Sequence, residues 1–269
     1  MATLRHPAVA GRFYPGDRDT LLENLQSYMS PAAAPKPALG CVAPHAGYMY
    51  SGPVAGAVYA DIDMPRRCVV LCPNHTGRGQ PLAVMSSGAW ETPLGAVQID
   101  SALADSLKQQ FPLLSEDSDA HRSEHAVEVQ LPFLQRRRQH FSFVPIAIGT
   151  GNFDTLETLG VALAEVLRAQ DEPVLIIASS DMNHYESDSV TRIKDHKAID
   201  RILALDARGL YDVVTKEDIS MCGFGPTVVM LTAAKRLGAT SAKLIKYATS
   251  GDVSGDRDMV VGYAGLVVR

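Results

Sequence analysis

The chain has 269 residues, of which 46% are hydrophobic and 20% are charged, and its formal net charge is −5. This balance is typical of a globular protein and excludes both a disordered chain and a general electrostatic attraction to nucleic acid. No apolar run reaches the ~18–20 residues that cross a bilayer, and residues 1–17 lack a signal-peptide core, so we expect a cytoplasmic protein without a membrane partner.

The predicted elements alternate between helices and strands. In chain order they are a helix over 17–29, an extended connection over 31–40, strands over 38–44, 67–73, 82–87 and 96–100, a helix over 101–111, a strand over 141–149, a helix over 154–170, a strand over 173–180, helices over 188–206 and 226–238, and strands over 243–249 and 259–268. Continuous apolar strands favour a parallel sheet that is covered on both faces, with the two shorter strands between 82 and 100 as candidates for an antiparallel edge. The alternation predicts a single domain over 1–269 with a three-layer α/β fold, in which helices flank a mostly parallel central sheet.

Capping residues and apolar periodicity define several of these helices. Asp100 and Asp154 are predicted N-caps, and the helix over 226–238 has Pro in its first turn and Gly at its end. The basic run at 136–138 is interpreted as a solvated helix face. The inward face of the helix over 188–206 is predicted to hold Ile193, Ile199, Ile202 and Leu203.

Three of the predicted buried strands are followed by a histidine. These residues are His45, His75 and His184. In open α/β sheets ligands bind outside the carboxyl ends of the strands, so the three imidazoles can converge on one crevice. Because imidazole is the commonest metal ligand near neutral pH, the pattern predicts a metal or catalytic centre there.

Other residues also carry side chains suited to such a centre. Cys222 lies in a Gly-rich loop before a helix, where backbone amides favour the thiolate. Glu124 and His125 stand at the start of a predicted helix, and Asp181 is either an N-cap or a carboxylate that orients a histidine. There is no CxxC pair, so a structural zinc knuckle is not expected. We predict the other cysteines to be reduced core residues and the other histidines to lie on the surface: Cys41, Cys68 and Cys72, and His6, His121, His140 and His196.

Five motifs follow one another along the chain. They are APHAGYMYSG (43–52), LCPNHTG (71–77), SEHAVEVQLPFL (123–134), SSDMNHY (179–185) and MCGFGPT (221–227). In this order they resemble the Memo family, whose bacterial and archaeal members are also called AmmeMemoRadiSam system protein B. The resemblance extends over essentially the whole chain. It implies a fold related to the class III extradiol dioxygenases, the LigB-like enzymes.

The resemblance also implies roles for individual residues. In LigB-like dioxygenases two histidines and a glutamate hold a non-heme Fe(II), and a further histidine acts as acid and base. By similarity, His45 and His75 match the metal histidines and His184 the acid–base histidine, while Cys222 falls where Memo proteins carry a cysteine in place of the metal-binding carboxylate. A thiolate is softer than a carboxylate and shifts the metal preference, so ring cleavage is less expected than other redox chemistry with iron or copper, and zinc is less favoured.

These considerations predict a metal-dependent redox protein, resembling a dioxygenase, that acts on an unidentified small molecule in a cleft at the carboxyl ends of the strands. Beyond the metal ligands, the candidate catalytic residues are His184, Asp181 and His125, and the candidate substrate-binding residues are Glu124, Tyr48 and Tyr50.

Two other functions fit the same residues. One is a non-catalytic module of the Memo family that binds a metal or a peptide segment in the former active-site cleft. The other is a zinc hydrolase with Glu124 as general base, although the chain lacks an HExxH spacing. The family name also implies a radical-SAM partner system, while this chain carries no cysteine spacing of its own that indicates an iron–sulfur site.

Overall fold

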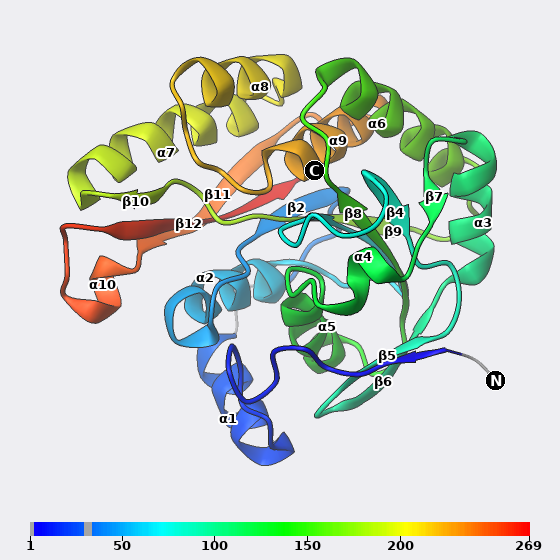
Figure 1. Cartoon of the computed structure of the whole chain (residues 1–269), viewed down its shortest axis with the longest axis horizontal. Helices are drawn as coiled ribbons and strands as arrows, with labels where there is room; N and C mark the ends of the chain where they lie inside the picture. The colour runs from blue at the N-terminus through cyan, green and yellow to red at the C-terminus, as the bar shows by residue number, and fades with distance from the viewer. Residues whose placement is uncertain (1–2, 30–33) are drawn as a thin grey trace.

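The computed structural model describes residues 3–29 and 34–269 (Figure 1). Within these residues the strands form one sheet, whose main path runs in the order β1-β5-β6-β8-β3-β9-β2-β12-β10. Beside this path, β4 pairs with β8 and β7, and β11 pairs with β12. The strands are β1 (Leu4–Arg5), β2 (Gly40–Ala43), β3 (Arg67–Pro73), β4 (Leu82–Val84), β5 (Ala89–Thr92), β6 (Gly95–Ile99), β7 (Ser115–Glu116), β8 (Ser142–Ile148), β9 (Val174–Ser179), β10 (His184–Glu186), β11 (Ala242–Thr249) and β12 (Val260–Val268).

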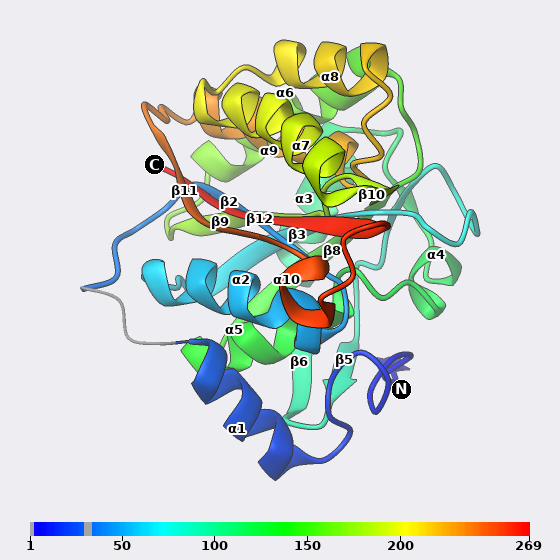
Figure 2. The same cartoon turned by 90° about the vertical axis from the view of Figure 1, so that its left-hand side faces the viewer.

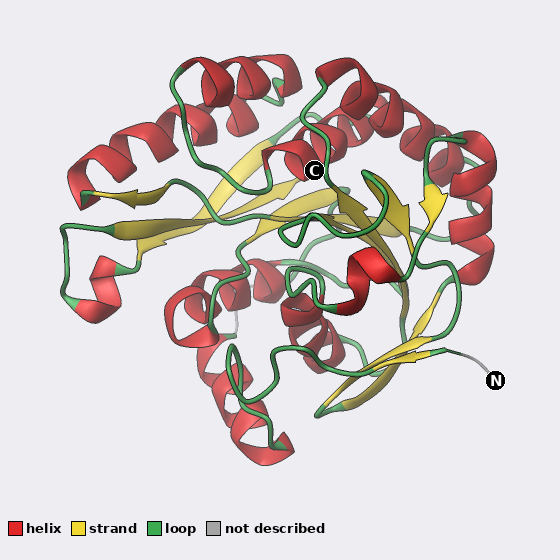
Figure 3. Ribbon diagram, viewed as in Figure 1, coloured by secondary structure: helices red, strands yellow, loops and turns green. Residues whose placement is uncertain are grey.

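Helices connect these strands, as the colouring by secondary structure shows (Figure 3). They are α1 (Arg18–Tyr28), α2 (Tyr48–Asp61), α3 (Ser101–Gln110), α4 (Asp119–Arg122), the 3-10 helix η1 (Glu128–Gln130), α5 (Leu131–Arg137), α6 (Phe153–Arg168), α7 (Asp188–Leu203), α8 (Ala207–Lys216), α9 (Phe224–Arg236) and α10 (Gly251–Ser254).

The centre of the sheet is parallel. The strands β6, β8, β3, β9 and β2 run in one direction, with Cys68 beside Phe143 on one side and beside Leu175 on the other. β12 then pairs antiparallel with β2, and β4 pairs antiparallel with β8. Because the central strands are parallel, the loops that follow β3, β9 and β2 all leave from the same edge of the sheet.

Two layers of helices cover the sheet, which is seen edge-on between them in Figure 2. Alternate side chains of each strand enter different cores: Val69 and Leu71 pack on the side of α3, α6, α7, α8 and α9, whereas Cys68 and Val70 pack on the side of α1, α2 and α5. Alternation between opposite faces is the geometry of a strand that is buried on both sides. The predicted three-layer α/β fold with a mostly parallel central sheet is therefore confirmed.

The apolar runs identified the central strands well. β3 has the predicted bounds, and β2, β8 and β9 lie within the predicted segments. The thiols of Cys41, Cys68 and Cys72 are free and fully buried in the core, as expected, and burial raises the pKa of each. The extended connection that we expected over 31–40 lies partly outside the described residues.

Helix α2 was not expected from the sequence. Its segment contains Pro53, Gly52 and Gly56, all of which lower helix propensity. A Cβ at position 56 would lie 2.5 Å from the carbonyl oxygen of Tyr28, so the glycine permits α1 and α2 to pack closely. Tertiary packing thus determines this helix. Helix α8 was not predicted either: it lies in a stretch for which we expected neither a helix nor a strand.

Several residue-level predictions were wrong. Helix α6 begins at Phe153 with Asn152 as its N-cap, so Asp154 lies inside the first turn. The side chain of Ile193 is not inward, since 61% of its surface is exposed. His121 is not a surface residue either: it is fully buried, with its ring edge-on to Trp90. His6, His140 and His196 are exposed as predicted. Among residues 3–29 and 34–269, no helix combines the length and apolarity needed to cross a membrane.

Burial of His121 predicts an acid-sensitive contribution to stability. Burial, with the charge of Arg5 as a second cause, lowers the pKa of His121 to about 4. Since the unfolded chain takes up this proton near pH 6.5, the contribution is complete above pH 6.5 and is lost as the pH falls toward 4, amounting to about 3 kcal/mol. We expect His121→Gln to flatten the dependence of the free energy of unfolding on pH in this window, measured by denaturant titration. The exposed His140→Gln is the control, and identical pH profiles for the two variants would contradict the assignment.

Candidate metal centre

The carboxyl ends of three neighbouring strands carry the central residues of the site. His45 follows β2, His75 follows β3, and Asp181 and His184 follow β9, which lies between β2 and β3 in the sheet. The topology therefore places residues that are up to 139 positions apart along the chain at one edge of the sheet. Of the three histidines that we predicted to converge there, His45 and His75 do so, and His184 is not part of their cluster.

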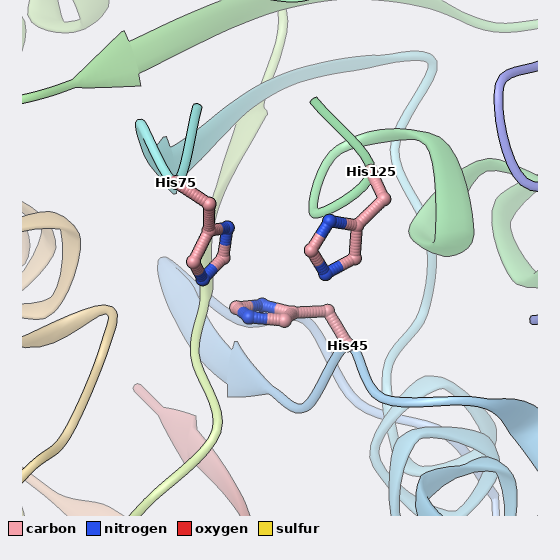
Figure 4. Close-up of side chains that lie close together, drawn as sticks. All are labelled: His45, His75 and His125. Atoms are coloured by element: carbon pink, nitrogen blue, oxygen red, sulfur yellow. The ribbon is translucent and has the colours of Figure 1, made fainter. Parts of the chain in front are cut away.

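Three imidazoles meet at this edge. One ligand nitrogen each from His45, His75 and His125 lies within 4.8 Å of the others, and Figure 4 shows the three rings facing a common point. The ring centroids are 5.1 Å apart for His45 and His75, 5.4 Å for His45 and His125, and 4.8 Å for His75 and His125. The convergence of His45 and His75 was expected, whereas His125 was expected only beside the metal.

A hydrogen bond at Nδ1 fixes the tautomer of His45. The hydroxyl of Ser179 donates to the Ala126 carbonyl at 2.7 Å, so its proton is committed. Nδ1 of His45, 2.9 Å from the same Oγ, must therefore donate, and Nε2 keeps its lone pair. The carboxylate of Asp181 also accepts the backbone N–H of His45 at 2.7 Å. Burial, followed by the charges of neighbouring histidines, lowers the pKa of His45 well below 6.5, so the ring is neutral at pH 7.

The Glu124 carboxylate fixes the ring of His75 through Nδ1, as Ser179 fixes the ring of His45. It accepts the backbone N–H of His75 at 2.7 Å and Nδ1 at 2.9 Å, so Nε2 of His75 is also directed away from its partner. Burial opposes the positive charge on His75, but the hydrogen bond and charge of Glu124 outweigh it and raise the pKa of the ring. Burial likewise disfavours the Glu124 carboxylate, yet its bonds to His75 lower its pKa. A carboxylate behind a ligating imidazole is a common way to orient the ring.

His125 completes the trio from a loop. We expected Glu124 and His125 at the start of a helix, but they lie between α4 and η1. Nδ1 of His125 is 3.4 Å from the Glu124 carboxylate, and the ring packs against Phe13. Burial, ahead of the opposing attraction of Glu124, lowers the pKa of His125. Two of the three imidazoles thus have a lowered pKa, which keeps their lone pairs available to a cation.

Cys222 lies directly beside His45. Its Sγ atom is 3.2 Å from Nε2 of His45 and accepts the backbone N–H of Asp181 at 3.3 Å. Our expectation that helix amides stabilise the thiolate was wrong for this environment. Burial and then the charge of Asp181 outweigh the backbone hydrogen bonds and raise the pKa of Cys222, so the group is a thiol unless a bound metal ion displaces its proton to solvent.

Asp181, which we expected to be an N-cap or to orient a histidine, binds His45 and not His184. Nδ1 of His184 is 2.9 Å from the carbonyl oxygen of Ser220, while the Asp181 carboxylate binds the backbone of His45. Burial raises the pKa of Asp181 to about 6. The proposed catalytic roles of His184 and Asp181 stay predictions.

The two tyrosines of the first motif differ in accessibility. Tyr48 is buried, donates its hydroxyl to the Val129 carbonyl at 2.7 Å and packs against Phe133. Tyr50 is partly exposed on the first turn of α2. Of the residues predicted to bind substrate, Glu124 and Tyr48 are thus buried, and Tyr50 is the more accessible one.

Sequence reasoning missed the residues that hold the His125 loop. Arg5 donates to the carbonyls of His121 and Glu124 and pairs with the buried Glu128 at 2.7 Å. Glu128 also accepts the hydroxyl of Tyr14 at 2.7 Å. This network joins the N-terminal segment to the loop. A signal was available, because Glu128 is a charged residue within the apolar part of the third motif.

The donor set suits a transition metal. Two nitrogen ligands of one tetrahedral ion lie about 3.3 Å apart, and a nitrogen and a sulfur ligand about 3.6 Å apart. Cys222 Sγ and His45 Nε2, at 3.2 Å, are already close to such a separation. The imidazole nitrogens, within 4.8 Å of one another, need only a small closing movement. Imidazole nitrogens with a cysteine thiolate fit copper, iron or zinc and would not select calcium or magnesium.

The fold and the site define an α/β protein with a histidine-rich candidate metal centre at the carboxyl edge of its sheet. Comparison with known proteins assigns the family: the Memo-like protein family matches residues 5–267. A MEMO1 family protein of Methanopyrus kandleri is 44% identical over 98% of this chain and 99% of its own length. Another, of Pyrobaculum aerophilum, is 45% identical over 98% of each chain. The chain belongs to the Memo family.

A solved structure supports the fold independently. An uncharacterized protein of Escherichia coli K12 matches with a TM-score of 0.51 and 12% identity, covering 85% of this chain and 98% of its own. At this identity the likeness shows a shared fold alone.

The glycine after Cys222 predicts a test of how the thiol is placed. A Cβ on Gly223 would lie 2.4 Å from both the Ser179 carbonyl oxygen and the Ser180 Cβ, too close for either to remain in place. We expect Gly223→Ala to lower the free energy of unfolding by about 1–3 kcal/mol and to change the reaction rate of Cys222 with a thiol reagent. The other thiols are buried, so this rate reports Cys222.

The control for this substitution is Gly151→Ala. Its added Cβ would meet only the Phe224 ring, at an ordinary 3.5 Å. If Gly223→Ala matched this control in both stability and thiol reactivity, the close approach of the Cys222 segment to the end of β9 would be wrong.

Proposed function

We propose that the protein binds one iron or copper ion through His45, His75 and Cys222 and uses it in redox chemistry on a small molecule. The structure adds His125 as a further candidate ligand. When bound, such an ion supplies a redox-active Lewis acid with positions open to a second molecule. The polypeptide supplies the ligands, their orientation and a proton-transfer group.

The observation that carries the proposal is the common orientation of the imidazoles. Nδ1 of His45 and Nδ1 of His75 are engaged by Ser179 and Glu124, which leaves Nε2 as the candidate metal-binding atom of each ring. The Cys222 sulfur reaches the same Nε2 of His45. Three separate segments of the chain thus supply donor atoms to one place. A histidine that only makes a structural hydrogen bond would not need the other two segments.

His184 is the group that we assign to proton transfer. It is partly exposed and follows β9, at the same edge of the sheet as the histidine cluster. Its Nδ1 faces a backbone carbonyl, which leaves Nε2 to accept or release a proton.

The hydrolase alternative receives less support. Both oxygens of Glu124 accept hydrogen bonds, from the backbone and ring of His75 and from the backbone of Ala126. The side chain is also fully buried, so it is placed to orient His75 and is poorly placed to activate a water molecule.

Metal titration of variants tests the proposal. Calorimetry with Cu(II), and with Fe(II) under anaerobic conditions, should show one site whose affinity falls by more than ~100-fold in His45→Ala and His75→Ala, because each removes a ligand. Comparison of Cys222→Ser with His125→Ala identifies the third ligand: the larger loss marks the residue that binds the ion. The exposed His140→Ala, at the amino end of β8, is the control.

Two outcomes would count against the proposal. Wild-type affinity in His45→Ala would place the metal elsewhere. A loaded protein that consumes no dioxygen with candidate small molecules above the level of the apoprotein would favour the non-catalytic module of the Memo family instead.

A further inference from the structure

His184 is held by a compact hydrogen-bonded unit that the sequence did not suggest. Its backbone N–H donates to the Ser220 hydroxyl at 2.8 Å, and its Nδ1 lies 2.9 Å from the Ser220 carbonyl oxygen. A carbonyl oxygen can only accept, so Nδ1 of His184 carries the proton and Nε2 has the lone pair. One residue, Ser220, thus fixes the backbone, the ring orientation and the tautomer of His184.

Asn183 fixes Ser220 in turn. The amide oxygen of Asn183 accepts both the backbone N–H and the hydroxyl of Ser220 at 3.1 Å. The amide nitrogen donates to Glu186 at 2.7 Å, which determines the orientation of the amide group. Asn183 is fully buried, and its backbone N–H donates to the buried carboxylate of Asp195 at 2.8 Å. Every polar group of Asn183 is therefore engaged in holding this arrangement.

The same unit reaches the candidate ligand Cys222. Ser220 lies two positions before Cys222 in the connection between α8 and α9, whereas Asn183 and His184 lie at the start of β10. A shift of Ser220 would consequently move the His184 ring and the Cys222 segment together. Gly223, on the other side of Cys222, is held by a bond from its N–H to the Ser180 hydroxyl at 3.0 Å.

We propose that Asn183 and Ser220 are positioning residues that hold His184 as its Nδ1–H tautomer, present Nε2 as its basic atom, and couple that orientation to the placement of Cys222. The importance of this coupling for catalysis rests on the proposed function, in which His184 transfers a proton and Cys222 binds the metal. The tautomer and the coupling themselves are properties of the folded chain.

Nuclear magnetic resonance of the apoprotein tests the tautomer directly. Long-range proton–nitrogen correlation spectra of ¹⁵N-histidine-labelled protein, recorded at a pH where the imidazoles are neutral, distinguish a protonated Nδ1 from a protonated Nε2. The signals of His184 are assigned by their loss in His184→Gln. We expect the Nδ1–H form in the wild-type protein; a predominant Nε2–H form would overturn the proposal without any variant being needed.

Substitution of Ser220 tests the positioning role. Ser220→Ala removes the hydroxyl that joins His184 to Asn183, so we expect the Nε2–H form to rise several-fold and the reaction rate of Cys222 with a thiol reagent to change several-fold in parallel. Ser220→Thr keeps a hydroxyl and should restore both readings. Ser189→Ala is the control, because Ser189 is exposed on the nearby first turn of α7 and bonds only the Ser187 hydroxyl within the described residues.

The outcomes separate this inference from the proposed function. An unchanged tautomer in Ser220→Ala would overturn the role of Ser220, and a changed tautomer with unchanged Cys222 reactivity would overturn the coupling. Both readings are made on the apoprotein, so they stand even if metal titration shows that the cluster binds no ion. Conversely, loss of the Nδ1–H tautomer would leave metal binding by His45 and His75 untouched.

Discussion

The candidate site depends on hydrogen bonds made at the Nδ1 atoms of its histidines. Ser179 accepts from His45, Glu124 accepts from His75, and the Ser220 carbonyl accepts from His184. Each bond uses the nitrogen nearer the backbone, so that the outer nitrogen is the candidate metal-binding or proton-transfer atom; that of His45 lies 3.2 Å from the Cys222 sulfur. A histidine without such a partner would rotate and exchange tautomers. These bonds therefore fix the direction in which the Nε2 lone pair of each ring points.

Buried polar groups sustain this arrangement because their own requirements are met. Glu128 is fully buried, and its charge is balanced by Arg5 and by bonds from Tyr14 and from the backbone of Ala8 and Val9. Loss of one partner would leave an uncompensated buried charge, which is strongly destabilising. The N-terminal segment therefore fixes the loop that carries Glu124 and His125.

Much of the fold could be predicted from the sequence, because continuous apolar strands such as 67–73 admit few other interpretations. The same strands indicated that His45, His75 and His184 would share one edge of the sheet. Local patterns could not predict α2, whose glycines act through contact with Tyr28, or the burial of His121, whose setting is created by distant residues. The place of His125 in the cluster was missed for the same reason, since a loop residue becomes a candidate ligand only through tertiary structure. The Memo motifs identified the family, but they did not reveal that Ser179 and Ser220 direct the rings.

In the proposed site, imidazoles from separate strand ends bind one ion through their outer nitrogens. Crystals of the protein loaded with copper or iron, with anomalous diffraction recorded at the metal edge, test this claim most directly. We expect one strong peak, with Nε2 of His45 and of His75 at about 2.0–2.1 Å and the Cys222 sulfur at about 2.3 Å if it is a ligand. A peak bound through Nδ1 atoms, or one remote from this edge of the sheet, would contradict the account.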